Sequence, residues 1–243
     1  MKENMADIKN INQSIPITVI CATKLKKDQF VLSSQTGKSL FSVGSTSPVQ
    51  IRLFEENSIG LSELYNLAIE ESKESPSLLV FMHDDVLIND FFWTQRIYDG
   101  LENFDIVGVV GNTRRSIGQP GWIMTNLNGT LDEFKYLSGA IGQGSKFPPE
   151  KLDVFGQSGL ECKLMDGVFL AAYSETLHAS GLRFDPAYKF HFYDMDFCRS
   201  AEMLNLKMGT IPLSIVHASY GSLDQTWLDA YQRYLKKWGD NVY

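Results

Sequence analysis

An apolar run at residues 77–82 (SLLVFM) ends abruptly at His83, Asp84 and Asp85, and apolar residues resume at Val86. A run of this length suits a buried strand, so the pattern predicts two carboxylates and an imidazole at the carboxyl end of that strand. Open α/β sheets bind their ligands at such strand ends. Because charged groups are costly to bury unless a cation or hydrogen-bond donors compensate them, we expect a metal and diphosphate site here.

The same residues also suit an Asx-type turn, or a helix N-cap that leads into residues 89–93. The local sequence does not separate these structural readings from a ligand site.

Segments with strand and helix patterns alternate along the first half of the chain. Predicted strands lie at 17–23, 49–54, 77–82 and 104–111, and predicted helices at 60–72 and 90–103. This alternation is typical of an α/β fold with a mainly parallel central sheet flanked by helices. Residues 24–48 are polar and rich in Ser and Gly, which predicts a long loop or a hairpin over the sheet.

The second half begins with residues 112–160, which are rich in Gly, Pro, Asn and Gln and show little periodicity, as is typical of a binding or lid region. Regular patterns then predict a strand at 164–173, a short helix from Ser174, a helix at 193–206, a strand at 210–217 and a helix at 223–238. We expect residues 1–15 to be a flexible lead and residues 16–243 to form a single Rossmann-like domain.

Composition excludes several classes of function. The formal net charge of −7 argues against a nucleic-acid partner, because neutralising phosphates requires clustered Lys and Arg. Three widely spaced cysteines in apolar surroundings indicate neither a disulfide framework nor a zinc motif, and they suggest a reducing compartment. No signal peptide or transmembrane segment is evident, so we expect a cytoplasmic protein for which peripheral contact with a membrane stays open.

A second group of polar residues lies at 190–199 (FHFYDMDFCR). If a helix begins near Tyr193, Asp194 shares a face with Phe197 and Cys198, whereas Asp196 lies about 200° away around the helix axis. We therefore expect only Asp194 to face a pocket, where the first turn of the helix holds it ionised and able to accept a proton. The alternative is that both acids merely favour the helix N-terminus.

Four further residues are candidates for a binding site. His217 ends the predicted strand at 210–217, where a neutral imidazole can join carboxylate oxygens around a divalent ion. Arg114 and Arg115 follow a strand and could neutralise phosphate. Trp122, in an irregular segment, could stack on a sugar or a nucleobase. Each has an ordinary structural alternative as a core or solvated residue.

Taken together, these motifs carry a resemblance. A strand ending in His83-Asp84-Asp85, the segment 165–170 (MDGVFL), Phe184-Asp185 ahead of 193–199 (YDMDFCR), and the late His217 resemble the family 2 inverting glycosyltransferases of the GT-A fold. The similarity extends from about residue 17 to residue 238, and it is closest to the bacterial branch named after a streptomycin-biosynthesis protein. It implies a nucleotide-binding half at about 16–111, an acceptor-side half at about 112–222 and a C-terminal helix at 223–238.

The resemblance also implies roles for individual residues. Asp85 occupies the position of the family's metal-binding acid, and Asp84 that of the acid that meets the nucleotide ribose. Asp194 occupies the position of the catalytic base, and His217 matches a histidine near the metal or the diphosphate. His83 stands where the family most often has another acid, which leaves strict dependence on a metal open.

Cys21, Ala22 and Thr23, after the first strand, would lie against the nucleotide, although their identities differ from the family's usual pattern. The implied reaction moves a sugar from a nucleotide-sugar donor, a UDP-sugar, to an acceptor hydroxyl with inversion. Mn²⁺ or Mg²⁺ would hold the diphosphate, and the acceptor would be a glycan, a lipid-linked molecule or a small molecule.

Two other classes of function stay open. A sugar-phosphate nucleotidyltransferase would share the fold and the metal-binding acids, but it requires a Gly-rich triphosphate loop after the first strand, where this chain has residues 21–24 (CATK). A non-catalytic module that binds a sugar nucleotide or a glycan would not need Asp194.

Overall fold

The computed structural model describes residues 15–42, 48–219, 221 and 223–239. The flexible lead expected at residues 1–15 lies outside this part of the chain, except for Ile15.

The centre of the molecule is a mixed sheet whose strands are ordered β11-β5-β10-β3-β1-β2. Its members are β1 (Ile17–Ala22), β2 (Val49–Phe54), β3 (Leu78–Met82), β5 (Ile106–Gly108), β10 (Phe169–Tyr173) and β11 (Met208–Thr210). Of these strands, β10 alone runs antiparallel to its neighbours. Every residue of β3 is buried, as expected for a strand in the middle of a sheet that is covered on both faces. The predicted α/β fold with a mainly parallel central sheet is confirmed.

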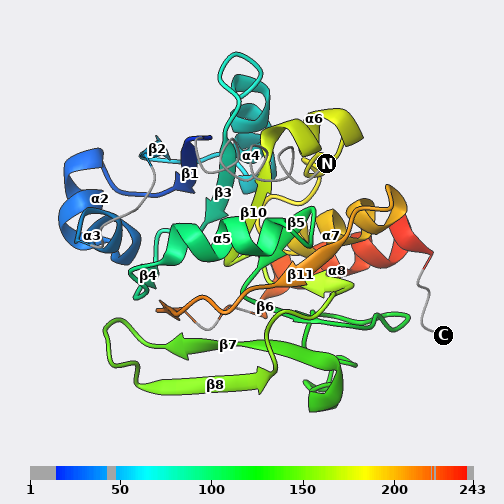
Figure 1. Ribbon diagram of the computed structural model, residues 1–243. Coiled ribbons are helices and arrows are strands. Elements are labelled where there is room, and N and C mark those ends of the chain that lie inside the picture. The colour runs from blue at the N-terminus through cyan, green and yellow to red at the C-terminus, as the bar shows by residue number, and fades with distance from the viewer. Residues whose placement is uncertain (1–14, 43–47, 220, 222, 240–243) are drawn as a thin grey trace, which may run out of the picture.

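Helices cover this sheet (Figure 1). They are α2 (Lys27–Ser33), α3 (Gln35–Ser42), α4 (Leu61–Glu71), α5 (Trp93–Leu101), α6 (Ser174–Ser180), α7 (Tyr193–Met203) and α8 (Gln225–Trp238). Helix α4 packs against β1 and α6, and α5 packs against β5. No helix in the described ranges is both long and apolar enough to cross a membrane.

The long loop or hairpin predicted at 24–48 is wrong, because α2 and α3 occupy most of it. These helices are only seven and eight residues long, and the Ser and Gly in and around them made the segment resemble a loop. Their close approach depends on Gly37, where an added Cβ would lie 2.1 Å from the carbonyl oxygen of Phe30. A glycine that the composition suggested as a loop residue therefore serves helix packing.

A second sheet, shown below the first in Figure 1, has the strand order β4-β12-β7-β6-β9, with β8 paired to β7. Its members are β4 (Val86–Ile88), β6 (Val110–Asn112), β7 (Leu137–Gln143), β8 (Lys151–Gly156), β9 (Leu164–Met165) and β12 (Ile215–His217). Residues 112–160, which lacked a recognisable pattern, thus contribute the β7–β8 hairpin. Its strands were missed because two glycines interrupt the alternation in β7, and because β8 exposes Leu152 and Val154.

Four segments of chain pass directly between the two sheets. They are the pairs β3 and β4, β5 and β6, β9 and β10, and β11 and β12. The continuous strands predicted at 104–111, 164–173 and 210–217 are each divided at such a crossing. The crossings place irregular backbone between the sheets, and both His83-Asp84-Asp85 and Asp166 lie on them.

Candidate functional site

The turn at the end of β3 is clamped by a buried side chain from α3. Thr36 is fully buried, and its Oγ1 lies 2.6 Å from the carbonyl oxygen of His83 and 2.9 Å from that of Val86. The Thr36 backbone N–H donates to the carbonyl oxygen of Asp84. Helix α3 therefore fixes the backbone from which His83, Asp84 and Asp85 project.

Three side chains converge beside this turn. His83, Asp85 and His217 each offer a ligand atom, and these atoms all lie within 4.8 Å of one another. His217 reaches the turn because β12 pairs antiparallel with β4, which sets His217 opposite Val86. The Nε2 of His217 lies 3.3 Å from Oδ1 of Asp85, and the Ser219 hydroxyl donates to Oδ2 of the same carboxylate.

Burial and the contact between Asp85 and His217 act in opposite directions on the pKa values of this group. Burial raises the pKa of Asp85, but the hydrogen bond and charge of His217 outweigh it, so the pKa lies well below its usual range. Burial lowers the pKa of His217, but the hydrogen bond and charge of Asp85 raise it above its usual value. For His83, burial and the nearby His217 lower the pKa, which favours the neutral imidazole.

The donor set suits a divalent transition metal. The Tyr193 hydroxyl donates to the carbonyl oxygen of Gly167 (2.8 Å), so it accepts from Nε2 of His83 (2.9 Å). This assignment leaves the lone pair of His83 on Nδ1, as in metal-binding histidines whose other nitrogen donates to a neighbour. Two imidazoles and one carboxylate suit a divalent transition metal better than Mg²⁺, which prefers oxygen ligands.

On the other side of the turn, Asp84 contacts the end of β1. Thr23 Oγ1 donates to Oδ2 of Asp84 over 2.6 Å. Of the residues expected beside a nucleotide, Ala22 is partly exposed and Thr23 is nearly buried, whereas the Cys21 side chain is completely buried in the core. Burial raises the pKa of Cys21 well above its usual value, so its thiol stays neutral.

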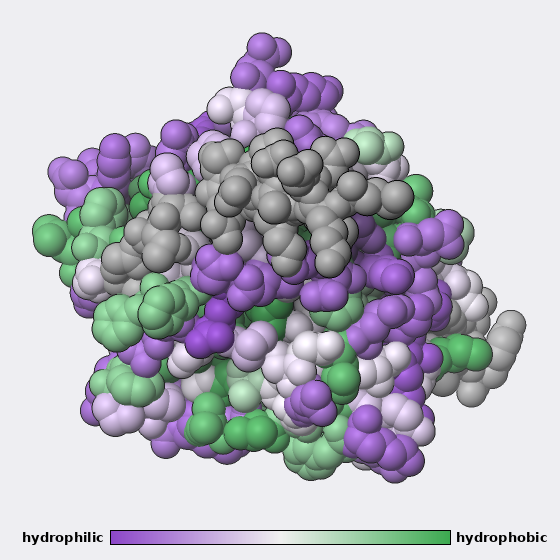
Figure 2. All heavy atoms as spheres, viewed as in Figure 1, coloured by the Kyte–Doolittle hydropathy of each residue, from purple (hydrophilic) through white to green (hydrophobic). Residues whose placement is uncertain are grey.

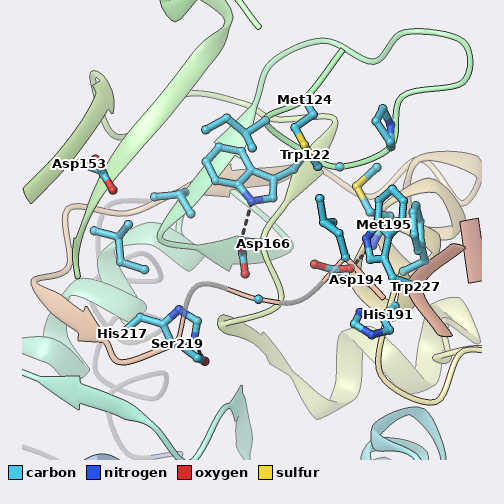
Figure 3. Close-up of a pocket in the computed structure, with 18 of the residues that line it drawn as sticks. Trp122, Met124, Asp153, Asp166, His191, Asp194, Met195, His217, Ser219 and Trp227 are labelled. Atoms are coloured by element: carbon cyan, nitrogen blue, oxygen red, sulfur yellow. Dashed lines mark hydrogen bonds between the residues drawn. The ribbon is translucent and has the colours of Figure 1, made fainter. Parts of the chain in front are cut away.

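A pocket of about 580 Å³ lies next to the histidine and aspartate group (Figure 3). Its lining includes His83 and His217 from that group, Asp166 and Asp194, and a set of large apolar side chains: Trp122, Ile123, Met124, Leu131, Phe155, Phe190, Phe192, Leu223 and Trp227. An aromatic lining with a few polar groups is the usual composition of a small-molecule site.

The two aspartates of α7 face different surroundings. Asp194 lines the pocket, and its Oδ2 accepts a hydrogen bond from the backbone N–H of Gly167 over 2.9 Å. Asp196 is completely buried on the side that packs against α8, where it binds Lys237 and Trp238. This is the arrangement expected from the helical period. Burial, followed by the charge of Asp166, raises the pKa of Asp194 to about 7, so the expectation that the first turn of the helix holds Asp194 ionised is wrong.

Asp166 is a pocket residue that lies in the segment 165–170 (MDGVFL) and that was not among the predicted site residues. Its Oδ2 accepts from Nε1 of Trp122 over 2.7 Å, the bond drawn in Figure 3. Trp122 lines the pocket as expected, but it is only 9% exposed and packs edge-on against Phe155. Asp166 precedes Gly167 in the chain, and this Asp-Gly pair near the start of the strand predicted at 164–173 was the available signal.

Arg114 and Arg115 do not line this pocket. Arg114 binds the buried Asp132 and stacks on Tyr136, with its guanidinium carbon 3.6 Å from the ring centroid. Arg115 binds Glu202 at 3.2 Å. Both guanidinium groups bind protein carboxylates in this structure, and their role as phosphate ligands stays a prediction.

No protein-family model and no curated protein sequence matches this chain. Solved structures do, and one of them is the crystal structure of GalNAc-T7 with UDP, GalNAc and Mn²⁺. The TM-score is 0.51 with 10% sequence identity, and the match covers 93% of this chain and 49% of that one. This chain has the GT-A fold. It spans about half the length of the GalNAc-T7 chain, and the likeness concerns the fold alone.

Proposed function

We propose that this protein is a metal-dependent glycosyltransferase that moves a sugar from a UDP-sugar to an acceptor hydroxyl with inversion. The observation that carries the proposal is the convergence of His83, Asp85 and His217 at the end of β3, beside a pocket that contains Asp194. In open α/β sheets this edge is where ligands bind. The GT-A fold, shared with a protein whose structure holds UDP and Mn²⁺, gives independent support.

In this proposal the residues at the end of β3 bind the donor. His83, Asp85 and His217 would hold Mn²⁺, which when bound neutralises the charge of the diphosphate leaving group. Asp84, whose Oδ2 accepts from Thr23, would accept hydrogen bonds from the ribose. Thr36 would keep these side chains in position, because its hydroxyl holds the backbone of the turn.

Asp194 would take the proton of the acceptor hydroxyl as that oxygen attacks the anomeric carbon. A single displacement inverts the anomeric configuration and requires one base on the acceptor side. A base with a pKa of about 7 is half ionised near neutral pH and binds a proton far more tightly than an ordinary aspartate. The aromatic side chains around it would exclude water and pack against the acceptor.

A thermal-shift screen of sugar nucleotides with and without Mn²⁺ tests the binding half of this proposal. A ligand that binds only the folded state stabilises it and so raises the unfolding midpoint. At a ligand concentration one hundred times the dissociation constant, the free energy of unfolding increases by about 2.7 kcal/mol. We expect UDP and one UDP-sugar to raise the midpoint only with Mn²⁺. No shift with any nucleotide would overturn the proposal.

The catalytic half is tested by incubating that UDP-sugar and Mn²⁺ with a panel of glycans, lipid-linked sugars and small alcohols. Proton NMR of the product should show the anomeric configuration opposite to that of the donor. A product of unchanged configuration contradicts inversion, and tight binding with no transfer to any acceptor would favour a non-catalytic sugar-nucleotide-binding module.

A further inference from the structure

One three-residue turn, residues 166–168 between β9 and β10, carries the pocket residue Asp166 and donates a hydrogen bond to the pocket residue Asp194. Within the turn, Oδ1 of Asp166 accepts from the N–H of Val168 over 2.8 Å. The intervening Gly167 donates its own N–H to Oδ2 of Asp194 over 2.9 Å. The position of one carboxylate therefore depends on the backbone that carries the other.

Trp122 fixes the position of Oδ2, the second carboxylate oxygen of Asp166. The indole N–H donates to it over 2.7 Å, and the carbonyl oxygen of Trp122 in turn accepts from the side-chain amides of Asn112 and Gln119, both at 3.0 Å. With the indole packed edge-on against Phe155, its N–H has little freedom to point elsewhere. Both oxygens of Asp166 thus accept from donors, as an ionised carboxylate does.

Gly167 lets this turn approach α7 closely. A Cβ added at Gly167 would lie 2.2 Å from the hydroxyl oxygen of Tyr193 and 2.9 Å from Cβ of Asp194. Any other residue would push the turn away from α7 and separate the two acids. Asp166 therefore supplies a negative charge, and Gly167 allows the turn that carries this charge to lie close to Asp194.

We propose that Asp166 is the positioning residue of this site, whose fixed negative charge and rigid turn keep the Asp194 carboxyl group ready to take a proton. The inference deepens the proposed function, since it rests on Asp194 as the base. Neither the sequence resemblance nor the fold match assigns a role to Asp166.

The other titratable groups around Asp194 do not supply this charge. Tyr65 on α4 and Tyr193 and Cys198 on α7 are buried, and burial raises the pKa of each, so all three are neutral near pH 7. Burial lowers the pKa of the pocket residue His191, which favours its neutral form. The remaining titratable residues of the described pocket lining are His83 and His217, at the proposed metal site, and Lys151 and Asp153 on β8, which form an ion pair at 2.6 Å.

Asp166 therefore acts on Asp194 in two ways. Its like charge disfavours ionisation of Asp194, an effect that follows burial as a cause of the raised pKa. Its hydrogen bond to Val168 orders the turn whose Gly167 N–H aims the Asp194 carboxylate. A purely structural Asp166 would supply the second effect without the first, so the titration of Asp194 separates the two.

The test is carbon-13 NMR of the aspartate carboxyl groups of the whole protein against pH, without substrate. The Asp194 resonance is identified by its loss in Asp194→Asn. We expect it to titrate near pH 7 in the wild type and about 1 pH unit lower in Asp166→Asn. Asp166→Glu, which keeps the charge, should titrate close to the wild type, and Asp153→Asn, which removes a different pocket acid, should leave the curve unmoved.

An unchanged Asp194 midpoint in folded Asp166→Asn would overturn the inference, as would an equal shift in Asp153→Asn. If Asp166→Asn does not fold, Asp166→Ser gives a second neutral variant. The wild type alone gives a third test, because the Asp166 resonance must respond at the pH where Asp194 titrates. Since no step needs a substrate, the two failures can be told apart. The expected shift in a protein that transfers no sugar would sink the proposed function, and it would leave only the effect of Asp166 on the titration of Asp194.

Discussion

Asp196 and Lys237 join α7 to α8 through an ion pair of 2.7 Å, in which the carboxylate is completely buried and the ammonium side chain is 34% exposed. Trp238 Nε1 donates to the same carboxylate over 2.9 Å. The pair holds the face of α7 opposite the pocket against α8. Asp196 therefore has a structural role.

Replacing Lys237 with Met should destabilise the fold by about 3 kcal/mol, because it leaves a buried carboxylate without its cation. Chemical denaturation followed by circular dichroism measures this change. Lys236→Met alters the neighbouring position of the same helix and serves as the control. Equal stability of the two variants would show that the pair contributes little.

Replacing Asp85 with Asn should weaken Mn²⁺-dependent binding of UDP at least about tenfold, since it removes the one anionic ligand of the proposed metal group. Isothermal titration calorimetry of UDP with and without Mn²⁺ measures the effect, and circular dichroism checks the fold. Asp153→Asn, elsewhere in the pocket lining, is the matched control. Unchanged affinity for UDP in folded Asp85→Asn would show that Asp85 does not bind the metal.

Replacing Asp194 with Asn should lower the rate of transfer by about 10²–10⁴-fold while donor affinity stays nearly unchanged. The base meets the acceptor during the reaction, whereas the metal group already holds the donor in the ground state. We therefore expect calorimetry to show weaker donor binding in Asp85→Asn but not in Asp194→Asn, whereas both variants should form less product. Transfer by Asp194→Asn at the wild-type rate would place the base elsewhere.

The raised pKa of Asp194 also predicts how stability and activity vary with pH. In the folded protein its pKa is about 7, against an ordinary value of 3.8, so between these values the folded state holds a proton that the unfolded state has lost. This contribution to stability is complete below the unfolded value and disappears as pH rises through about 7, where activity should increase as the base ionises. Denaturation of the wild type and of Asp194→Asn across this pH range isolates the effect, and the transfer rate should show an acid limb near pH 7.

Much of the fold could be predicted because its strongest signals are local. The run 77–82 is apolar at almost every position, and the acids that follow it announce a strand end. The faces of α7 followed from the helical period alone, which separated Asp194 from Asp196 before any contact was known.

The missed features depend on contacts between distant segments. Nothing near Val109 indicates that 104–111 divides between two sheets, because that division is set by partner strands that lie at least 25 residues away along the chain. The ion pairs of Arg114 and Arg115, and the indole of Trp122 that orients Asp166, are likewise tertiary contacts. His83 seemed to depart from a metal-binding pattern until the fold set it beside His217.

The segment 113–136, which carries Trp122 and Met124 into the pocket lining, should become better ordered when donor and metal bind. It is poorly secured on its outer side, where Ile117 is 75% exposed and Leu127 58% exposed. Residues that gain contacts with a bound ligand open less often and exchange their amide hydrogens more slowly. Hydrogen exchange with saturating UDP and Mn²⁺ should therefore show slower exchange in this segment and little change in β7, whose amides are already paired with β6 and β8. Equal exchange of this segment in the free and saturated protein would show that it does not close over the donor, and a change confined to β7 would point instead to movement of the second sheet.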